Sequence, residues 1–378
     1  MDSKGKSENT RHKGFFLLYS EINKEEPDGI ERKILSQIAM FEKAGIDMRT
    51  AVLERNTKTK WIYKEEYSEV DFIYFRKSTI IDWRFIKFFE RIHNNGKRPA
   101  IFMEIPTYPY DGEFGKGYKD RLSLMLDHYF RKRLGNCIDR IVVTGANVGE
   151  SLWGVKAINI VNGIDFTNVK QRNYVEHGNA INISCIAKFS PWHGYERLIL
   201  GLAEYYRNSP KQEVNLLMVG DGDERSMYEK LVLENGISEH VKFLGRLTGA
   251  KLNDIYNITD IGACSFGRYK SGIDVIGDLK SREFMAKGIP MICGCAIDVL
   301  IDKEYKYVLY FSNNVSRVDI NVILKWYRGL IHNKDFREIS DIIRKTSQNW
   351  IDYSITFKEV INETKCLWEG TGRITYYI

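Results

Sequence analysis

The sequence predicts an α/β protein with two Rossmann-like domains. Short apolar runs alternate with amphipathic helical segments in two series, over residues 14–168 and again over 180–349. Such alternation is typical of parallel sheets whose strands are joined by helical crossovers. Glycines follow several of the apolar runs, as they do at strand-to-helix turns. A length of 378 residues suits two or three domains of ordinary size.

The first series begins with an apolar run bounded by turn-forming residues, a good buried strand. The preceding residues 1–13 are polar and charged and predict a disordered leader rather than a secretory signal. A polar segment at 168–179 predicts the linker to the second series. The expected strands are 14–20, 48–53, 70–75, 100–105, 141–144 and 157–161, and the expected helices are 30–44, 83–92 and 118–134.

The second series repeats this order without repeating the sequence. Beyond Val315 the chain is predicted to be mostly helical. The expected strands are 181–187, 214–219, 241–244, 261–264 and 290–293, and the expected helices are 195–206, 225–235, 251–256 and 279–287.

The helix at 279–287 has clear end signals. Asp278 is a good N-cap, since its side-chain oxygen can accept from free backbone N–H groups, and Gly288 can adopt the left-handed conformation that ends a helix. Lys280 and Glu283 lie three residues apart on one face. They predict either a phosphate-ester site at the helix start or an ordinary ion pair on a solvated face.

Composition excludes some classes of function. A net charge of +6 is too mild for a dedicated nucleic-acid binder, although it permits anionic lipid or phosphorylated partners. The six cysteines lie mostly in apolar runs, which predicts reduced core thiols, and no second Cys/His pair has metal-ligand spacing. No apolar run reaches the roughly 20 residues of a membrane span, so we expect a cytoplasmic protein.

Three segments together resemble the retaining GT-B glycosyltransferases of group 1. They are Glu283-Phe-Met-Ala-Lys-Gly288-Ile-Pro290, the turn from Lys188 to Gly194, and Val219-Gly-Asp-Gly222. The resemblance implies two Rossmann-like domains facing across a cleft, with a C-terminal helix at about 350–378 crossing back to the first domain. It assigns acceptor binding to domain 14–168 and nucleotide-sugar binding to domain 180–349.

The resemblance also implies roles for individual residues. Cationic or hydrogen-bonding groups and a helix N-terminus would stabilise the charge of a departing nucleoside diphosphate. Glu283 would accept hydrogen bonds from the ribose hydroxyls. The implied donor-binding set is Gly29, Lys188, His193, Gly220, Gly222, Arg246, Lys280 and Glu283.

The sequence departs from the family pattern at two positions. His193 stands where lysine is common, and Val275 stands where a first glutamate is common. Asp274 and Asp278 flank Val275 and are candidates for that glutamate's catalytic role at the donor sugar. In the first domain Glu104 is the catalytic candidate and Asp111 the acceptor-binding one. The alternative for both is loop capping.

The implied function is transfer of a sugar, with retention, from a nucleotide-diphosphate sugar to a glycan or lipid-linked acceptor in surface polysaccharide biosynthesis. No cofactor and no obligatory metal are implied. The basic segment 117–135 predicts either contact with an anionic membrane or an ordinary surface helix. Rival functions are a nucleotide-sugar epimerase and a non-catalytic nucleotide-sugar-binding protein. A nicotinamide dehydrogenase is disfavoured because neither half completes the glycine fingerprint.

Overall fold

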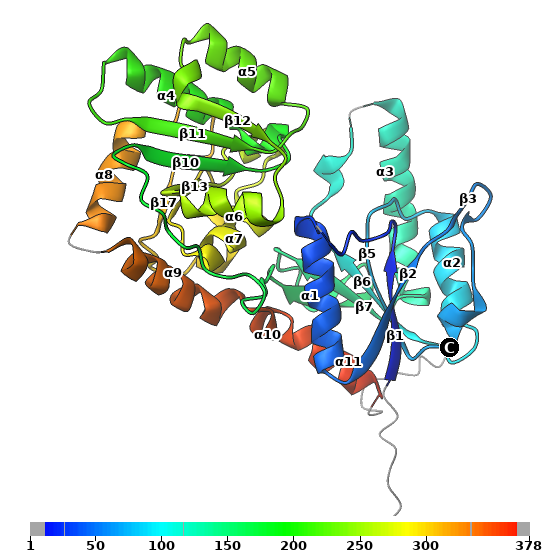
Figure 1. Ribbon diagram of the computed structural model, residues 1–378. Helices are drawn as coiled ribbons and strands as arrows, with labels where there is room; N and C mark the ends of the chain where they lie inside the picture. Colours follow the sequence, from blue (N-terminus) through cyan, green and yellow to red (C-terminus); the bar gives the residue numbers. More distant parts are fainter. Residues whose placement is uncertain (1–11, 26, 116, 333–334, 369–378) are drawn as a thin grey trace, which may run out of the picture. The chain divides into compact units, whose positions relative to one another are not determined.

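A computed structural model describes residues 12–25, 27–115, 117–332 and 335–368 (Figure 1). The chain forms two compact units. Unit 1 contains residues 1–23, 30–160 and 357–378, and unit 2 contains residues 24–29 and 161–356. Most of the predicted leader lies outside the described residues. The first strand begins at His12, so His12 and Lys13 belong to the sheet and not to a leader.

Unit 1 is built on a seven-stranded sheet in the order β2-β1-β5-β6-β7-β9-β8. Its neighbouring strands are parallel except for the short pair β8–β9, which is antiparallel. A separate hairpin is formed by β3 (Arg55–Asn56) and β4 (Lys60–Trp61). The sheet strands are β1 His12–Leu18, β2 Ile46–Val52, β5 Phe72–Arg76, β6 Ala100–Ile105, β7 Arg140–Thr144, β8 Ser151–Leu152 and β9 Val155–Ile160.

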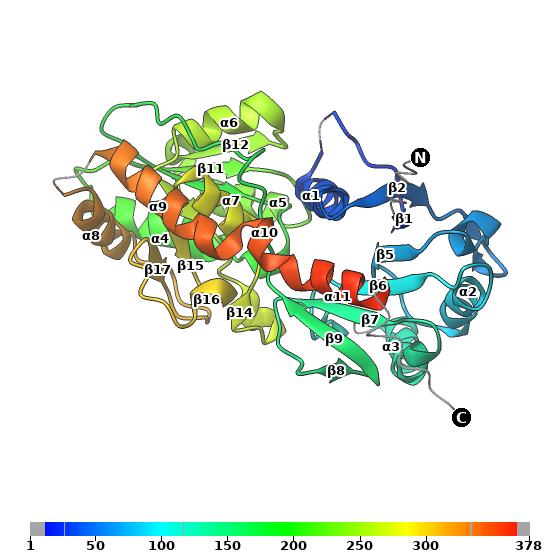
Figure 2. The same ribbon diagram turned by 90° about the horizontal axis from the view of Figure 1, so that it is seen from below.

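Helix α1 spans Gly29–Lys43, and all of it except Gly29 belongs to unit 1. The other helices of unit 1 are α2 (Trp83–His93), α3 (Tyr118–Phe130) and α11 (Lys358–Trp368). Helix α3 is shorter than predicted, because the chain continues as a 3₁₀ segment from Arg131 to Asn136. Helix α11 returns to unit 1 as predicted, and Figure 2 shows it beside the sheet. Its Glu363 carboxylate accepts from Arg140 at 2.8 Å and from Lys156 at 2.5 Å.

Unit 2 is a parallel six-stranded sheet in the order β12-β11-β10-β13-β15-β17. When its six strands are numbered from 1 to 6 along the chain, this is the 3-2-1-4-5-6 order of a doubly wound Rossmann sheet. The sequence pattern did not predict its edge strand β17. The strands are β10 Ile181–Ile186, β11 Val214–Val219, β12 Val241–Gly245, β13 Ile261–Ala263, β15 Met291–Cys293 and β17 Val308–Tyr310, with β14 Val275–Ile276 and β16 Ala296–Ile297 paired separately.

The first four helices of unit 2 begin and end close to their predicted bounds. For α7 the two caps are as predicted: Asp278 accepts from the backbone N–H of Ser281, and Gly288 has a φ of 74°. A Cβ at Gly288 would also lie 2.5 Å from the Ser340 carbonyl of α9, so the glycine lets α7 and α9 pack closely. The helices are α4 Glu196–Arg207, α5 Arg225–Glu234, α6 Gly249–Asn257, α7 Leu279–Lys287, α8 Ile320–Ile331, α9 Phe336–Ile351 and α10 Tyr353–Thr356.

No helix within the described residues is long and apolar enough to cross a membrane.

Candidate functional site

The strand order of unit 2 reverses between β10 and β13, and the loops that follow these two strands pack against each other. The backbone N–H of Phe266 donates to the His193 carbonyl at 2.7 Å, and that of Gly267 donates to the Trp192 carbonyl at 3.2 Å. Gly194 has a φ of 62°, and a Cβ there would lie 2.3 Å from the Gly267 nitrogen. Open α/β sheets bind ligands at such a reversal, outside the carboxyl ends of the strands.

His193 is held rigidly at this point. Its Nδ1 accepts from the Ser190 backbone N–H at 3.1 Å, and its ring stacks on Tyr195 with centroids 5.6 Å apart. Burial lowers the pKa of His193, and the positive charges of Lys280 and Arg268 lower it further. The imidazole is therefore neutral, and its proton resides on Nε2, because Nδ1 is an acceptor. This tautomer leaves an N–H donor for a ligand oxygen.

Lys280 reaches the same tyrosine from the first turn of α7. Its Nζ donates to the Tyr195 hydroxyl at 3.2 Å. Burial lowers the pKa of Lys280, and the nearby Asp278 carboxylate opposes that effect. The structure thus joins two predicted donor-binding residues, 87 positions apart in sequence, through one tyrosine.

The glycine turn after β11 packs against the loop after β10. Gly220 has a φ of 134°, and a Cβ there would lie 1.8 Å from the Ala187 carbonyl oxygen. Gly222 has a φ of 153°, and its Cβ would lie 2.3 Å from the Phe189 carbonyl oxygen. Both glycines are thus needed for packing. Their predicted role in ligand approach stays a prediction.

Glu283 lies one turn further along α7 than Lys280. Its carboxylate accepts from the Tyr256 hydroxyl at 2.8 Å, whereas Lys280 binds Tyr195. The two charged side chains thus contact different tyrosines, Tyr256 of α6 and Tyr195 directly before α4. Glu283 is only partly buried, as a ribose-binding carboxylate must be.

The remaining donor-side candidates lie around this centre. The side chains of Lys188 and Arg246 are exposed at the ends of β10 and β12. Gly29 belongs with unit 2, and a Cβ there would lie 3.8 Å from Leu279 Cδ1, next to Lys280. Asp274 is exposed and accepts from Asn313 Nδ2 at 2.8 Å.

Asp278, predicted as a catalytic candidate, also caps the N-terminus of α7. Its Oδ1 accepts from the Ser281 backbone N–H at 3.2 Å and so caps α7. Its Oδ2 is buried and has no hydrogen-bond partner within the described residues. The carboxylate keeps one oxygen for another contact, while the other caps the helix that carries Lys280 and Glu283.

Glu104 in unit 1 does not fit the predicted catalytic role. It is fully buried, and its carboxylate accepts from Lys33 at 2.6 Å, Gln37 at 2.7 Å and Tyr74 at 2.8 Å. Burial alone would raise its pKa, but Lys33 and Arg76 outweigh burial and hold the pKa at about 2. A carboxylate this enclosed and this acidic is a structural anchor for α1 against β6.

Asp111, the predicted acceptor-binding residue, is paired within unit 1. Its Oδ1 accepts from Arg131 at 3.0 Å, and its Oδ2 lies 2.9 Å from His128 Nε2. These contacts lower the pKa of Asp111 despite burial, which acts in the other direction. The side chain is partly exposed, so acceptor binding stays a prediction.

Sequence reasoning missed three residues of the site. Tyr195 connects His193 with Lys280, Tyr256 holds Glu283, and Arg268 lies close enough to lower the pKa of His193. Arg268 Nε and Ser265 Oγ are buried without a hydrogen-bond partner among the described residues. Arg268 belongs to the glycine-bearing loop 266–272, whose composition was the available signal.

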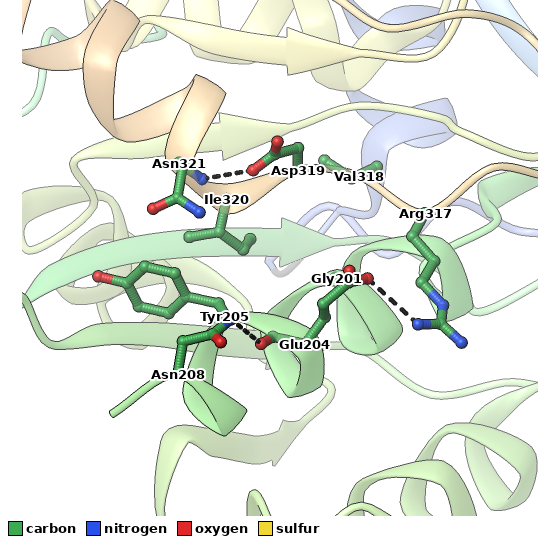
Figure 3. A pocket seen from close by; sticks show the side chains of 9 residues that line it. All are labelled: Gly201, Glu204, Tyr205, Asn208, Arg317, Val318, Asp319, Ile320 and Asn321. Atoms are coloured by element: carbon green, nitrogen blue, oxygen red, sulfur yellow. Dashed lines mark hydrogen bonds and ion pairs between the residues drawn. The ribbon is translucent and has the colours of Figure 1, made fainter. Parts of the chain in front are cut away.

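A small cavity of about 160 Å³ lies elsewhere, between α4 and the start of α8 (Figure 3). Glu204 and Arg317 form an ion pair of 3.1 Å at its edge. The cavity is lined by Gly201, Glu204 and Tyr205 of α4, whereas the loop carrying His193 precedes the first residue of this helix. The cavity is thus separate from the site at the strand ends.

Five of the six cysteines are buried free thiols, as predicted, but Cys366 is exposed. No group of three or more His, Cys, Asp or Glu side chains within the described part of the chain is arranged to hold a metal ion.

Part of unit 2 matches a known protein family. Residues 169–297 match the family model for glycosyl transferases group 1. This range contains the loops of unit 2 described above, except those that carry Gly29 and Asn313. A GDP-mannose-dependent monoacylated α-(1-6)-phosphatidylinositol monomannoside mannosyltransferase of Corynebacterium glutamicum is 31% identical over 113 residues. That match covers 30% of this chain and 29% of the relative.

Solved structures share the fold along nearly the whole chain. The Anabaena protein HepE in complex with UDP has a TM-score of 0.65 at 16% identity and covers 93% of this chain and 99% of its own. A glycosyltransferase from Rickettsia africae has a TM-score of 0.66 at 12% identity, with coverage of 96% and 100%. The predicted GT-B fold is confirmed, and residues 169–297 match the group 1 glycosyltransferases, whereas retention stays a prediction.

Proposed function

We propose that the chain is a glycosyltransferase that takes a sugar from a nucleotide-diphosphate donor bound to unit 2. The observation that carries the proposal is the meeting of His193 and Lys280 on Tyr195, at the point where the strand order reverses. The family match over the same loops supports it.

The chemistry of this centre suits a leaving diphosphate. Negative charge develops on the diphosphate as the bond to the sugar breaks, and donors fixed in advance stabilise that charge without reorganising. The neutral His193 offers an Nε2–H group, Lys280 offers an ammonium, and the first turn of α7 adds free backbone N–H groups. Lys188, Gly220, Gly222 and Gly29 are proposed to border the diphosphate.

The nucleoside is proposed to extend toward α6. Glu283, supported by Tyr256, is the proposed acceptor of hydrogen bonds from the ribose hydroxyls, and the backbone near Arg246 is proposed to contact the base. Asp274 or Asp278 is proposed to face the donor sugar. The relatives differ in base, since the Corynebacterium enzyme is named for GDP-mannose and the Anabaena structure contains UDP. Both nucleotides therefore need testing.

The finer parts of the proposal rest on the family resemblance. They are retention at the anomeric carbon, no requirement for a metal, and a glycan or lipid-linked acceptor near Asp111. A glycolipid acceptor agrees with the name of the Corynebacterium relative. We also propose that the enzyme works in the cytoplasm, in the synthesis of surface polysaccharide.

Variants at the two joined residues test the proposal. His193→Ala and Lys280→Met should each weaken UDP or GDP binding at least about tenfold, because each removes a donor to a charged ligand. Lys325→Met, an exposed lysine on α8, is the matched control and should bind as the wild type does. The measurement is isothermal titration calorimetry with UDP and GDP. Unchanged affinity in both site variants contradicts the assignment.

Product analysis separates the rival functions. Incubation with UDP- and GDP-sugars should give sugar transfer only when an acceptor is present. A changed donor sugar without acceptor would identify an epimerase instead. Nucleotide binding without any turnover, across a panel of glycan and glycolipid acceptors, would identify a binding protein.

A further inference from the structure

Helix α3 of unit 1 turns a stripe of apolar side chains toward solvent. Its opposite side carries the buried Asp127, and Phe130 at its end packs partly on the core. Only Asp127 among its residues is fully buried. At about 100° per residue, the apolar side chains of α3 form a stripe about 100° wide, centred roughly opposite Asp127. The exposed fractions along this stripe are Tyr118 82%, Leu122 47%, Met125 69%, Leu126 38% and Tyr129 55%.

Polar contacts fix α3 in this orientation. Asp127 Oδ2 accepts from the Ile81 backbone N–H at 2.8 Å, and its Oδ1 accepts from the Tyr110 hydroxyl at 2.6 Å. The next residue on the same face, Arg131, donates to Asp111 at 3.0 Å and lies 4.7 Å over the Trp153 ring. Because these buried partners hold the polar face, the apolar stripe cannot turn inward without leaving a buried carboxylate unpaired.

Basic side chains border the stripe. On the same helical wheel Lys119 and Arg121 lie about 70–90° to either side of its centre, and both are exposed. Lys132 and Arg133 are exposed just beyond the end of the helix, and the Arg133 guanidinium lies 4.8 Å over the Tyr129 ring. An apolar stripe with basic margins is the pattern of a helix that lies in a membrane interface, with the cations at the headgroups.

We propose that α3 docks unit 1 on an anionic lipid surface, with the stripe from Tyr118 to Tyr129 inserted among the acyl chains near the headgroups. Charge complementarity decides between occupants. If a second copy of this chain covered the stripe, the basic residues of the two copies would repel each other, whereas anionic headgroups neutralise them. These residues are Lys119, Arg121, Lys132 and Arg133. The inference rests on α3 alone and does not depend on the proposed donor chemistry.

Vesicle binding tests the proposal with the full chain. The wild-type protein should sediment with vesicles of phosphatidylglycerol and phosphatidylcholine and much less with phosphatidylcholine alone. The variant Leu122→Glu/Met125→Glu should lower the partition coefficient at least about tenfold, because two apolar side chains no longer insert. Leu233→Glu, at a site 74% exposed on α5, is the matched control and should bind as the wild type does.

A second variant separates charge from apolar insertion. Lys119→Ser/Arg121→Ser should lower binding to the anionic vesicles by roughly fivefold per residue. It should leave the weak binding to phosphatidylcholine unchanged. Slowed amide hydrogen exchange of residues 118–130 on the anionic vesicles would locate the contact. All variants should keep the wild-type melting temperature, since the changed side chains are exposed.

Three results would overturn the proposal. One is absence of wild-type binding to anionic vesicles. Another is equal binding by Leu122→Glu/Met125→Glu. The third is a wild-type dimer in analytical ultracentrifugation that the same variant converts to monomer, which would show that a second copy covers α3. None of these results bears on nucleotide binding by unit 2, so failure of this proposal and failure of the proposed function are distinguishable.

Discussion

Replacing Glu104 tests whether this residue is a structural anchor or a catalytic group. Its folded pKa of about 2 lies below the ordinary 4.5. A depressed carboxylate pKa contributes stability that is present above pH 4.5 and is lost as the pH falls through about 2. With about 1.4 kcal/mol for each tenfold change in acidity, the contribution is about 3 kcal/mol at neutral pH.

Glu104→Gln should therefore destabilise unit 1 by about 3–5 kcal/mol, because it removes the carboxylate charge that lies 2.6 Å from the buried Lys33 ammonium. Lys33→Met should also be destabilising, because it removes the ammonium closest to the buried Glu104 carboxylate. The double variant should be more stable than the sum of the two single losses predicts, since neither charge is then buried alone.

Hydrogen exchange followed by mass spectrometry on peptides of β6 and α1 reports this quantity for unit 1 without interference from unit 2. The acid dependence between pH 4.5 and 2 should be present in the wild type and absent in Glu104→Gln. Additive single losses would contradict the ion-pair account. A Glu104→Gln protein as stable as the wild type but inactive in sugar transfer would restore the catalytic assignment.

Further predictions concern unit 2. The Asp260 carboxylate, 3.2 Å from His177 Nε2, raises the pKa of His177. The stability that the His177–Asp260 contact contributes should therefore be complete below pH 6.5 and should fall as the pH rises through the raised pKa of His177. In urea unfolding from pH 6 to 8, His177→Gln should remove this pH dependence. Gly220→Ala should cost about 1–3 kcal/mol by overpacking and weaken UDP or GDP binding in calorimetry. Gly236→Ala is the control: it shares the positive φ, at 66°, but has open space around its Cβ, so it should lose less stability and keep nucleotide binding. Tyr195→Phe removes the hydrogen bond to Lys280 but keeps the stacked ring. It should weaken nucleotide binding less than Lys280→Met does, and an equal loss would contradict the role given to the ammonium.

Local chemistry explains why some of the fold was predictable. The caps of α7 follow from Asp278 and Gly288, which lie directly next to the helix and act through their own backbone geometry. Short edge elements carry no such signal. Strand β17 has only three residues, Val308–Tyr310, and its periodicity cannot be told from a loop.

The candidate site was predictable to the extent that motif order placed it at strand ends. Its internal contacts were not, because they join segments far apart in sequence. Tyr195 and Lys280 meet across 85 residues, and Glu104 meets Lys33 across 71. A sequence shows that a carboxylate follows a strand, but only the packed structure shows whether it is enclosed by a lysine or left open to a substrate.

Helix α3 shows the same limit. The periodicity of its apolar residues was visible in the sequence, but an apolar stripe normally faces the core. The buried contacts of Asp127 with Ile81 and Tyr110 reverse that orientation, and they involve residues 46 and 17 positions away.

The central claim is that a nucleoside diphosphate binds where the loops after β10 and β13 meet the start of α7. Hydrogen exchange of the wild-type protein with and without saturating UDP or GDP tests this most directly. Slowed exchange in residues 188–194, 264–268 and 279–283 is the expected result. Protection confined to the cavity between α4 and α8, or none in unit 2 with either nucleotide, would contradict the account.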